Sequence, residues 1–256
     1  MDMKILLGFV CFFSSFVFLI FIFLKKILYR IFLLMFNAPN FYKFINGDDM
    51  KSIKIALTSM FLILSSYASA VEISSNVGLS SDYIWRGMTQ TNGDIAVNGG
   101  FDLSTDNGFY FGTWASNASA GTASMELDIY IGFSGEMAEN MTYDVGYISV
   151  IYPGNDALDF EEAYVGFNIY GLSILYSDGQ NDGPSYSEIG YSVDAGPGSF
   201  SISYGEYEDT GDNSLVGYDW NVGDFSLGFY YYDFEADPAG TMTDDDGAYV
   251  SLSRSF

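Results

Sequence analysis

The stretch Ser124–Gly135, SMELDIYIGFSG, alternates apolar and polar residues along its whole length. One parity is apolar: Met125, Leu127, Ile129, Ile131 and Phe133. The other parity is polar or small: Glu126, Asp128, Tyr130, Gly132 and Ser134. Successive side chains of a β-strand point to opposite faces of its sheet, so this period of two predicts a strand with one apolar and one polar face.

The same alternation recurs through residues 71–256. It predicts twelve strands, at 72–86, 94–104, 108–116, 125–134, 141–151, 160–169, 172–177, 187–193, 200–205, 214–221, 225–232 and 248–256. Long and short connections alternate between them, as they do in membrane barrels with long outer loops and short periplasmic turns. The sequence therefore predicts an all-β fold, a transmembrane antiparallel up-and-down β-barrel of about 12 strands.

Charge separates this part of the chain from the residues before it. Residues 71–256 hold 30 of the 33 acidic residues but only two of the nine basic ones, Arg86 and Arg254. A segment so poor in cations excludes nucleic-acid binding. Soluble sheets usually protect their edges with lysine, and there is no lysine after residue 54. A soluble periplasmic β-barrel that binds a small ligand is an alternative.

The inventory of reactive side chains predicts no enzyme and no cofactor. The chain has no histidine, and its one cysteine is Cys11. This removes Ser-His-Asp and Cys-His catalysis, histidine-ligated metals and disulfides from residues 71–256. Neighbouring acids such as Glu161 and Glu162 point to opposite faces of a strand and cannot form a glycosidase pair.

The residues before the predicted barrel read as an export signal. Residues 50–70, MKSIKIALTSMFLILSSYASA, combine a basic start, an apolar run and the small residues Ala68 and Ala70. This pattern predicts a signal peptide cleaved after Ala70, a barrel over 71–256, and a location in the outer membrane of a Gram-negative cell. Residues 1–49 are either upstream sequence mis-called as coding or an apolar leader with a membrane anchor at 5–24.

Several stretches carry a family resemblance. Residues 76–90, NVGLSSDYIWRGMTQ, resemble the start of the TorF-type porins, proteobacterial outer-membrane proteins with the motif S-D-Y-x-aromatic-R-G-x-[ST]-Q. Residues 99–102 and 108–117 resemble the next two strands of that family. The resemblance covers residues 71–256 and implies an outer-membrane barrel that is called a porin by analogy. Members often have arginine where this chain has Ile84, so no paired-arginine role is carried over.

The last residues, YVSLSRSF, form an alternating strand that ends on Phe256. A terminal phenylalanine in this position resembles the signature that the barrel-assembly machinery recognises in outer-membrane proteins. Arg254 departs from that signature. The expected partners are this machinery through Phe256, outer-membrane lipid and lipopolysaccharide, and small solutes or ions. The oligomeric state is not predicted.

Parity also predicts the residues that line the lumen. It places Tyr83 and Trp85 toward lipid and Arg86 toward the lumen, with Asp94 or Asp102 as its partner. Two roles stay open for Arg86: a constriction element opposite acids, or a salt bridge that pins the first hairpin. The predicted pore-lining set is Asp82, Arg86, Asp102, Glu126, Asp128 and Asp144.

The predicted function is passive diffusion of ions or small hydrophilic solutes, with a preference for cations, because a ring of acids favours cations. A lumen whose acids serve only to keep its wall hydrated is the alternative to this preference. A second alternative is a non-conducting structural or interaction barrel whose acidic loops bind divalent cations or lipopolysaccharide. Asp244, Asp245 and Asp246 are weak candidates for such a metal site, and a solvated loop is the competing interpretation.

Overall fold

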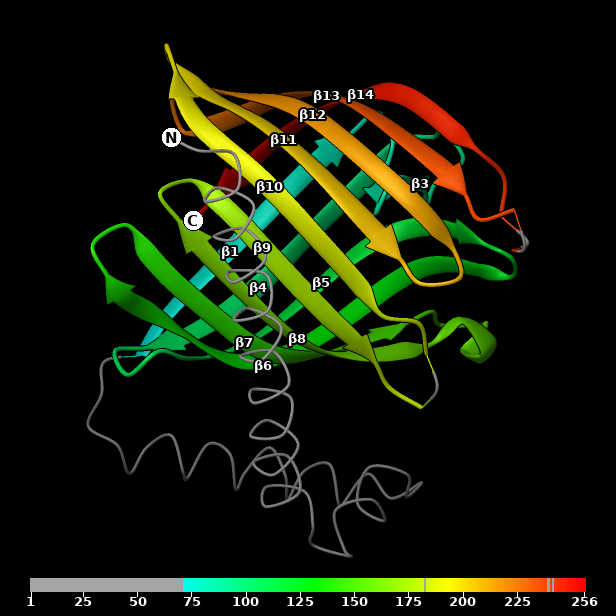
Figure 1. The fold of residues 1–256 in the computed structure, drawn as a ribbon, viewed down its shortest axis with the longest axis horizontal. Coiled ribbons are helices and arrows are strands. Elements are labelled where there is room, and N and C mark those ends of the chain that lie inside the picture. Colours follow the sequence, from blue (N-terminus) through cyan, green and yellow to red (C-terminus); the bar gives the residue numbers. More distant parts are fainter. Residues whose placement is uncertain (1–70, 182, 239, 241) are drawn as a thin grey trace, which may run out of the picture. The chain divides into compact units, whose positions relative to one another are not determined.

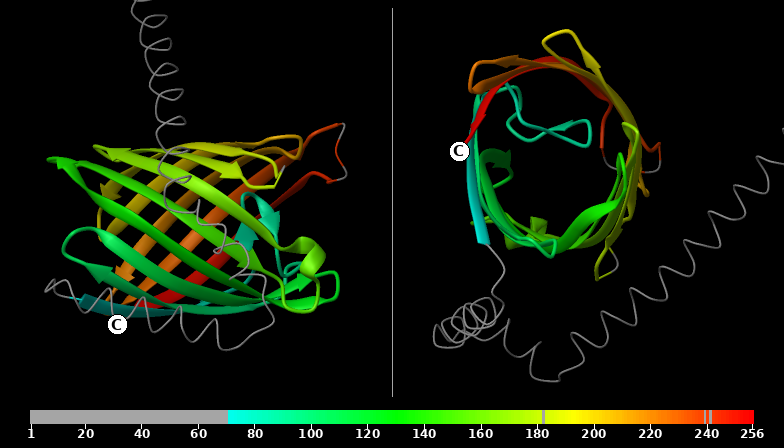
Figure 2. Two further views of the ribbon diagram at one scale, coloured as in Figure 1. Left: turned by 90° about the horizontal axis from the view of Figure 1, so that it is seen from below. Right: turned by 90° about the vertical axis from the view of Figure 1, so that its left-hand side faces the viewer.

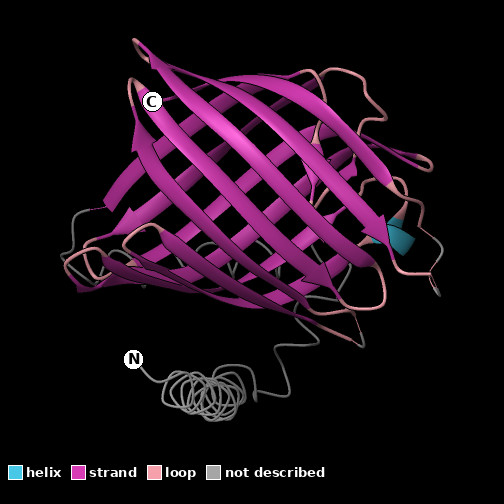
Figure 3. Ribbon diagram, turned by 45° about the horizontal axis from the view of Figure 1, so that its top comes forward, coloured by secondary structure: helices cyan, strands magenta, loops and turns pink. Residues whose placement is uncertain are grey.

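Twelve antiparallel strands form one closed barrel (Figure 1; Figure 3). The computed structural model describes residues 71–181, 183–238, 240 and 242–256, so the predicted signal peptide and residues 1–49 lie outside the described residues. The barrel strands are β1 (Val71–Ser80), β4 (Ala96–Thr105), β5 (Phe109–Ala120), β6 (Ala123–Ala138), β7 (Met141–Ile151), β8 (Phe160–Ile169), β9 (Leu172–Gly179), β10 (Tyr186–Ala195), β11 (Gly198–Tyr207), β12 (Gly211–Val222), β13 (Phe225–Ala236) and β14 (Asp245–Ser255).

Each barrel strand pairs with the next along the chain, and β14 returns to pair with β1. The closing pairs run from Asn76 opposite Ser255 to Ser80 opposite Ser251. The predicted fold class is therefore confirmed. No helix in the described part of the chain is long and apolar enough to cross a membrane. The one helical segment there is the single 3-10 turn η1 (Asp156–Leu158).

The connections differ between the two ends of the barrel. Tight turns join the strands at the end that carries the C-terminus, for example at Tyr170-Gly171, where both residues have positive φ (52° and 85°). Longer segments follow β1, β7, β9 and β13 at the opposite end. Two gaps predicted to be long, around 116–123 and 206–213, are mostly strand: β5 and β6 are separated by two residues, as their pairing of Ala120 with Ala123 shows.

The apolar faces of the strands point out of the barrel. On β6, Ile129, Ile131 and Phe133 are exposed, while Glu126 and Asp128 are buried on the inner side, as the alternation predicts. Other exposed apolar side chains follow the same outward parity: Ile73, Val77, Leu79, Val97, Phe101, Ile189, Val193, Phe200, Ile202, Trp220, Phe229, Val250 and Leu252. This barrel thus has an apolar outer surface and a polar interior.

Glycines on the inner wall give room to tyrosine rings of neighbouring strands. A Cβ atom on Gly112 would overlap the ring of Tyr130, and one on Gly132 would overlap the ring of Tyr110. The tyrosines therefore lie along the wall instead of projecting straight across the lumen. Gly166 also lies on the inner wall but has no ring above it; its Cβ would meet nothing closer than 3.8 Å.

The predicted first strand, 72–86, is too long. β1 ends at Ser80, and residues 81–95, called the inward loop below, turn into the barrel (Figure 2). The middle of the loop is a small hairpin of β2 (Ile84–Trp85) and β3 (Met88–Thr89). Asp82 accepts hydrogen bonds from the hydroxyls of Thr89 and Thr91, both 2.7 Å, and so ties the loop to itself. Tyr83 and Trp85 therefore do not face lipid, and that prediction is wrong.

The Gly–Tyr packing predicts different outcomes for two glycine substitutions on the same wall. Gly112→Ala forces the ring of Tyr130 to move and should lower the free energy of unfolding by about 1–3 kcal/mol, as overpacking does. Gly166→Ala is the matched control and should be close to neutral, because its new methyl group makes ordinary contacts. Urea unfolding of both variants in lipid vesicles measures this difference, and equal losses would contradict it.

Candidate functional site

The tip of the inward loop is a two-residue turn, Arg86-Gly87, with φ values of 48° and 79°. Turns with two positive φ values favour Asn-Gly. A left-handed arginine costs on the order of 1–3 kcal/mol and persists where its surroundings hold it. Two backbone bonds tie the ends of the loop to the wall: Ser119 N donates to Gln90 O on the β5 side (2.7 Å), and Ser81 N donates to Val250 O on β14 (2.9 Å).

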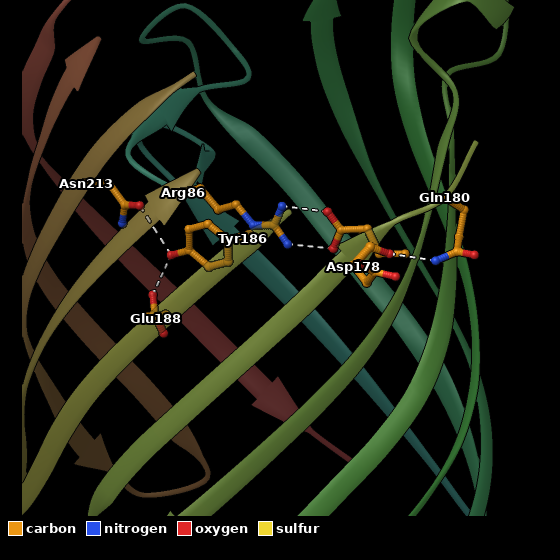
Figure 4. A network of polar contacts seen from close by, with 7 residues as sticks. Arg86, Asp178, Gln180, Tyr186, Glu188 and Asn213 are labelled. Atoms are coloured by element: carbon orange, nitrogen blue, oxygen red, sulfur yellow. Dashed lines mark hydrogen bonds and ion pairs between the residues drawn. The ribbon is translucent and has the colours of Figure 1, made fainter. Parts of the chain in front are cut away.

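The side chain of Arg86 extends from the loop tip into an enclosed site on the inner wall, formed by β8, β10 and β11. Its Nη1 and Nη2 atoms each donate to one carboxylate oxygen of Glu162 on β8, both at 2.6 Å. The side chains of this pair are only 6% and 3% exposed. Its guanidinium carbon lies 4.0 Å from the centre of the Tyr186 ring (Figure 4). It lies 4.9 Å from the centre of the Tyr207 ring. We call Glu162, Tyr186 and Tyr207 the arginine cage.

The partner of Arg86 is therefore Glu162, and the prediction of Asp94 or Asp102 is wrong. That prediction assumed that Arg86 continues the first strand, whose neighbours are β4 and β14. The chain instead leaves the wall after Ser80 and extends into the barrel, so its tip reaches β8, β10 and β11.

The wall around the cage is held by further contacts. The hydroxyl of Tyr186 donates to Glu188 at 2.9 Å and lies 3.2 Å from Asn213 Oδ1 (Figure 4). A Cβ atom on Gly87 would lie 2.7 Å from Cβ of Asn213 and 3.1 Å from Cβ of Phe234. The loop tip therefore packs directly on β12 and β13, with no room for a side chain at position 87.

A second contact holds the base of the loop. The hydroxyl of Tyr83 donates to Glu126 on β6 at 2.6 Å, and its ring packs edge-on against Trp114 at 5.2 Å. Burial and the neighbouring Glu126 carboxylate raise the pKa of Tyr83, so its hydroxyl stays protonated and remains a donor. Asp128 lies beside Glu126, and one of its buried oxygens has no partner among the described residues.

A separate polar layer lies nearer the short-turn end of the barrel. Tyr130 donates to Asp102 and Tyr110 donates to Asp144, both at 2.5 Å. The Tyr110 and Tyr164 hydroxyls are 2.6 Å apart. On the other side of the lumen Tyr230 donates to Asp219 and stacks on Tyr249, with ring centres 4.7 Å apart. This layer presents carboxylates and tyrosines to the lumen.

The predicted pore-lining residues do not form one ring. Asp82 lies inside the inward loop, Glu126 and Asp128 lie near its base, and Asp102 and Asp144 belong to the second layer. Arg86 contacts none of these five acids through an ion pair; it is paired with Glu162.

Alternation put Glu161 and Glu162 on opposite faces of a strand but did not indicate the role of Glu162, and it did not single out Tyr186 or Tyr207. Tyr186 and Glu188 share one parity of β10, and this shared parity was the available signal.

The carboxylates of Asp244, Asp245 and Asp246 do not converge on one point where they could bind a metal ion. Asp244 accepts a hydrogen bond from Ala236 N at 3.0 Å, and Asp246 accepts one from the outward-facing Tyr231. Asp245 and Asp246 are adjacent on β14 and point to opposite faces. Within the described ranges, no group of three or more His, Cys, Asp or Glu side chains is placed to hold a metal ion.

Comparison with known proteins gives one family and a set of similar folds. The profile of a family described as "Bacterial protein of unknown function (Gcw_chp)" matches residues 65–256. No curated protein matches the chain. A structure of the KdgM porin in complex with disordered oligogalacturonate matches with a TM-score of 0.50 and 8% identity, covering 73% of this chain and 99% of that one. The NanC porin matches with a TM-score of 0.47 and 9% identity, covering 72% and 99%. The chain thus has a porin-like barrel fold.

Replacing each of the two arginines of the barrel by lysine should change the unfolding free energy by different amounts. Arg86→Lys loses the paired hydrogen bonds to Glu162 and should cost about 1.5–3 kcal/mol of unfolding free energy. Arg254→Lys is the matched control: Arg254 makes one bond, to Asp224, and the two side chains are 35% and 73% exposed, so its loss should stay below about 1 kcal/mol. Equilibrium unfolding in vesicles measures both, and a neutral Arg86→Lys would contradict the assignment.

Proposed function

The chain belongs to the Gcw_chp family of bacterial proteins, and we propose that it is an outer-membrane channel for small hydrophilic solutes with a preference for cations. The observation that carries this proposal is the combination of an apolar outer surface with a lumen lined by carboxylates. The similar porin folds support the barrel architecture, and the transport role is our inference.

The outer surface supports insertion in a bilayer. Large apolar side chains are exposed around the barrel, where water would make them costly and lipid would not. Every barrel strand is paired with two neighbours, so the barrel sheet has no free edge to expose to lipid. The predicted signal peptide, the terminal Phe256 and the TorF-type motif are consistent with delivery to the outer membrane by the barrel-assembly machinery.

The lumen supports a preference for cations. Its wall carries Asp102, Asp144, Glu188 and Asp219, while the one arginine of the inward loop is already paired with Glu162. Carboxylates that line a narrow passage attract cations and repel anions. We assign no catalytic step to these residues.

The inward loop favours a second candidate, a barrel that does not conduct. The loop is held by Tyr83 at its base, Arg86 at its tip and backbone bonds to β5 and β14, so it is attached to several parts of the wall. A loop fixed in this way narrows or closes its end of the lumen. In that case the barrel would serve a structural or binding role, with lipopolysaccharide or divalent cations at the acidic outer loops as its partners.

Reversal potentials in a KCl gradient across planar bilayers test the channel. We expect a current that prefers K⁺, and a smaller preference in Asp102→Asn/Asp144→Asn, because both carboxylates face the lumen. Glu206→Gln is the matched control; Glu206 is exposed on the outward face of β11, so its loss should leave the selectivity unchanged. A preference for Cl⁻ would refute the cation channel, and the absence of any current would favour the non-conducting barrel.

A further inference from the structure

We propose that the arginine cage, Glu162, Tyr186 and Tyr207, is a binding site for organic cations that carry a guanidinium group, and that Arg86 is its internal occupant. This inference deepens the proposed channel by naming a solute class and a gate. Only the consequence for transport rests on the proposed channel. Binding of a guanidinium compound to the cage can be measured whether or not the barrel conducts.

The geometry of the cage matches a planar guanidinium. Two nitrogen atoms of Arg86 meet the two oxygens of Glu162 at equal distances of 2.6 Å, which is the paired contact that a fork of N–H groups makes with a carboxylate. The face of Tyr186 lies 4.0 Å from the guanidinium carbon, where a cation is attracted to the ring. A sodium ion has no N–H donors and no planar face, so it reproduces neither the two parallel hydrogen bonds nor the stacking on the ring.

The three residues of the cage belong to the barrel wall, and the loop adds one group of its own, the ring of Trp85, whose centre lies 4.8 Å from the guanidinium carbon. The side chains of the cage come from β8, β10 and β11, and Tyr186 lies directly opposite Tyr207 in the β10–β11 ladder. Their rings meet edge to face, with centres 5.9 Å apart. Glu188 fixes the Tyr186 hydroxyl on the side away from Arg86. A site held by the wall in this way keeps its shape when its occupant leaves, which lowers the cost of binding another one.

The occupant, in contrast, arrives on a separate segment under strain. Arg86 is presented by a hairpin turn with φ of 48°, a conformation that arginine disfavours. Arg254 is the comparison within this barrel: it is half-buried, makes one bond of 2.9 Å to the exposed Asp224, and lies 4.8 Å from the centre of the Phe256 ring and 5.4 Å from that of Phe225. Arg86 differs from Arg254 in having a second hydrogen bond to its carboxylate, a closer ring at 4.0 Å and almost no contact with solvent. A free guanidinium compound would compete with Arg86 for the same atoms and so favour release of the loop tip.

The experiment empties the cage and offers it a free occupant. Arg86→Gly removes the side chain and suits the positive φ of the turn. The purified variant in detergent micelles is heated with increasing methylguanidinium chloride, and with NaCl at the same concentrations. Three matched chains are treated alike: the unchanged protein, Arg86→Gly/Glu162→Gln, and Arg254→Gly, which lacks an arginine outside the cage.

We expect a saturable rise of a few degrees in the unfolding temperature of Arg86→Gly with methylguanidinium, because a ligand that binds the folded state stabilises it. NaCl should give no such rise, and neither should the other three proteins show it. Tyr186→Phe in the Arg86→Gly background keeps the ring and should retain the effect.

A rise equal in the Glu162→Gln double variant, or none in Arg86→Gly, would overturn the proposal. If Arg86→Gly does not fold alone, the yield of folded barrel with and without methylguanidinium is the readout, and no rescue overturns it. Failure of the channel itself is seen separately, as absence of current in bilayers with the cage still binding.

Discussion

The backbone N–H and C=O groups of the barrel wall must be paired within the protein, because the outer surface of the wall is apolar. Closure of β14 on β1 meets this requirement, since it leaves every strand with two partners. Once the sheet is closed, the alternation of side chains along each strand decides which of them face outward and which face the lumen. Side chains such as Ile129 and Phe133 point outward, and side chains such as Glu126 and Asp128 share an interior of limited width.

That interior has too many carboxylates to be left without donors. Tyrosine hydroxyls are the main donors to these carboxylates: Tyr83, Tyr110, Tyr130 and Tyr230 each donate to an inward acid. The tyrosines fit because glycines on adjacent strands leave space for their rings. A tyrosine hydroxyl donates without adding a charge, so the wall stays negative while its acids are hydrogen-bonded. This combination supports the proposed preference for cations.

Among the residues that the structure describes, the inward loop adds the one positive charge in the interior. Arg86 is nearly inaccessible to solvent, paired with Glu162 and covered by aromatic rings, so its charge is largely neutralised where it lies. Its effect on a passing solute therefore depends on whether the loop tip stays in the cage. The contact that holds the loop tip inside the barrel also defines the proposed guanidinium site, which links the proposed solute class to the proposed opening.

The sequence by itself determined the wall. Strict alternation gave twelve strands, their inner and outer faces and the even count, because the parity of a strand is a local property that each segment reports alone. Glu126, Asp128, Asp102 and Asp144 lie on the inner side, which is the parity that alternation assigns to them.

Only the tertiary structure decided the fate of residues 81–95. Their alternation continues that of β1, yet Asp82 bonds to Thr89 and Thr91 and the segment folds inward. The partner of Arg86 is 76 residues away in the chain, and the tyrosines of its cage are farther still. Such contacts are set by the closure of the barrel, which brings β8, β10 and β11 around the loop tip, and no local pattern encodes that meeting.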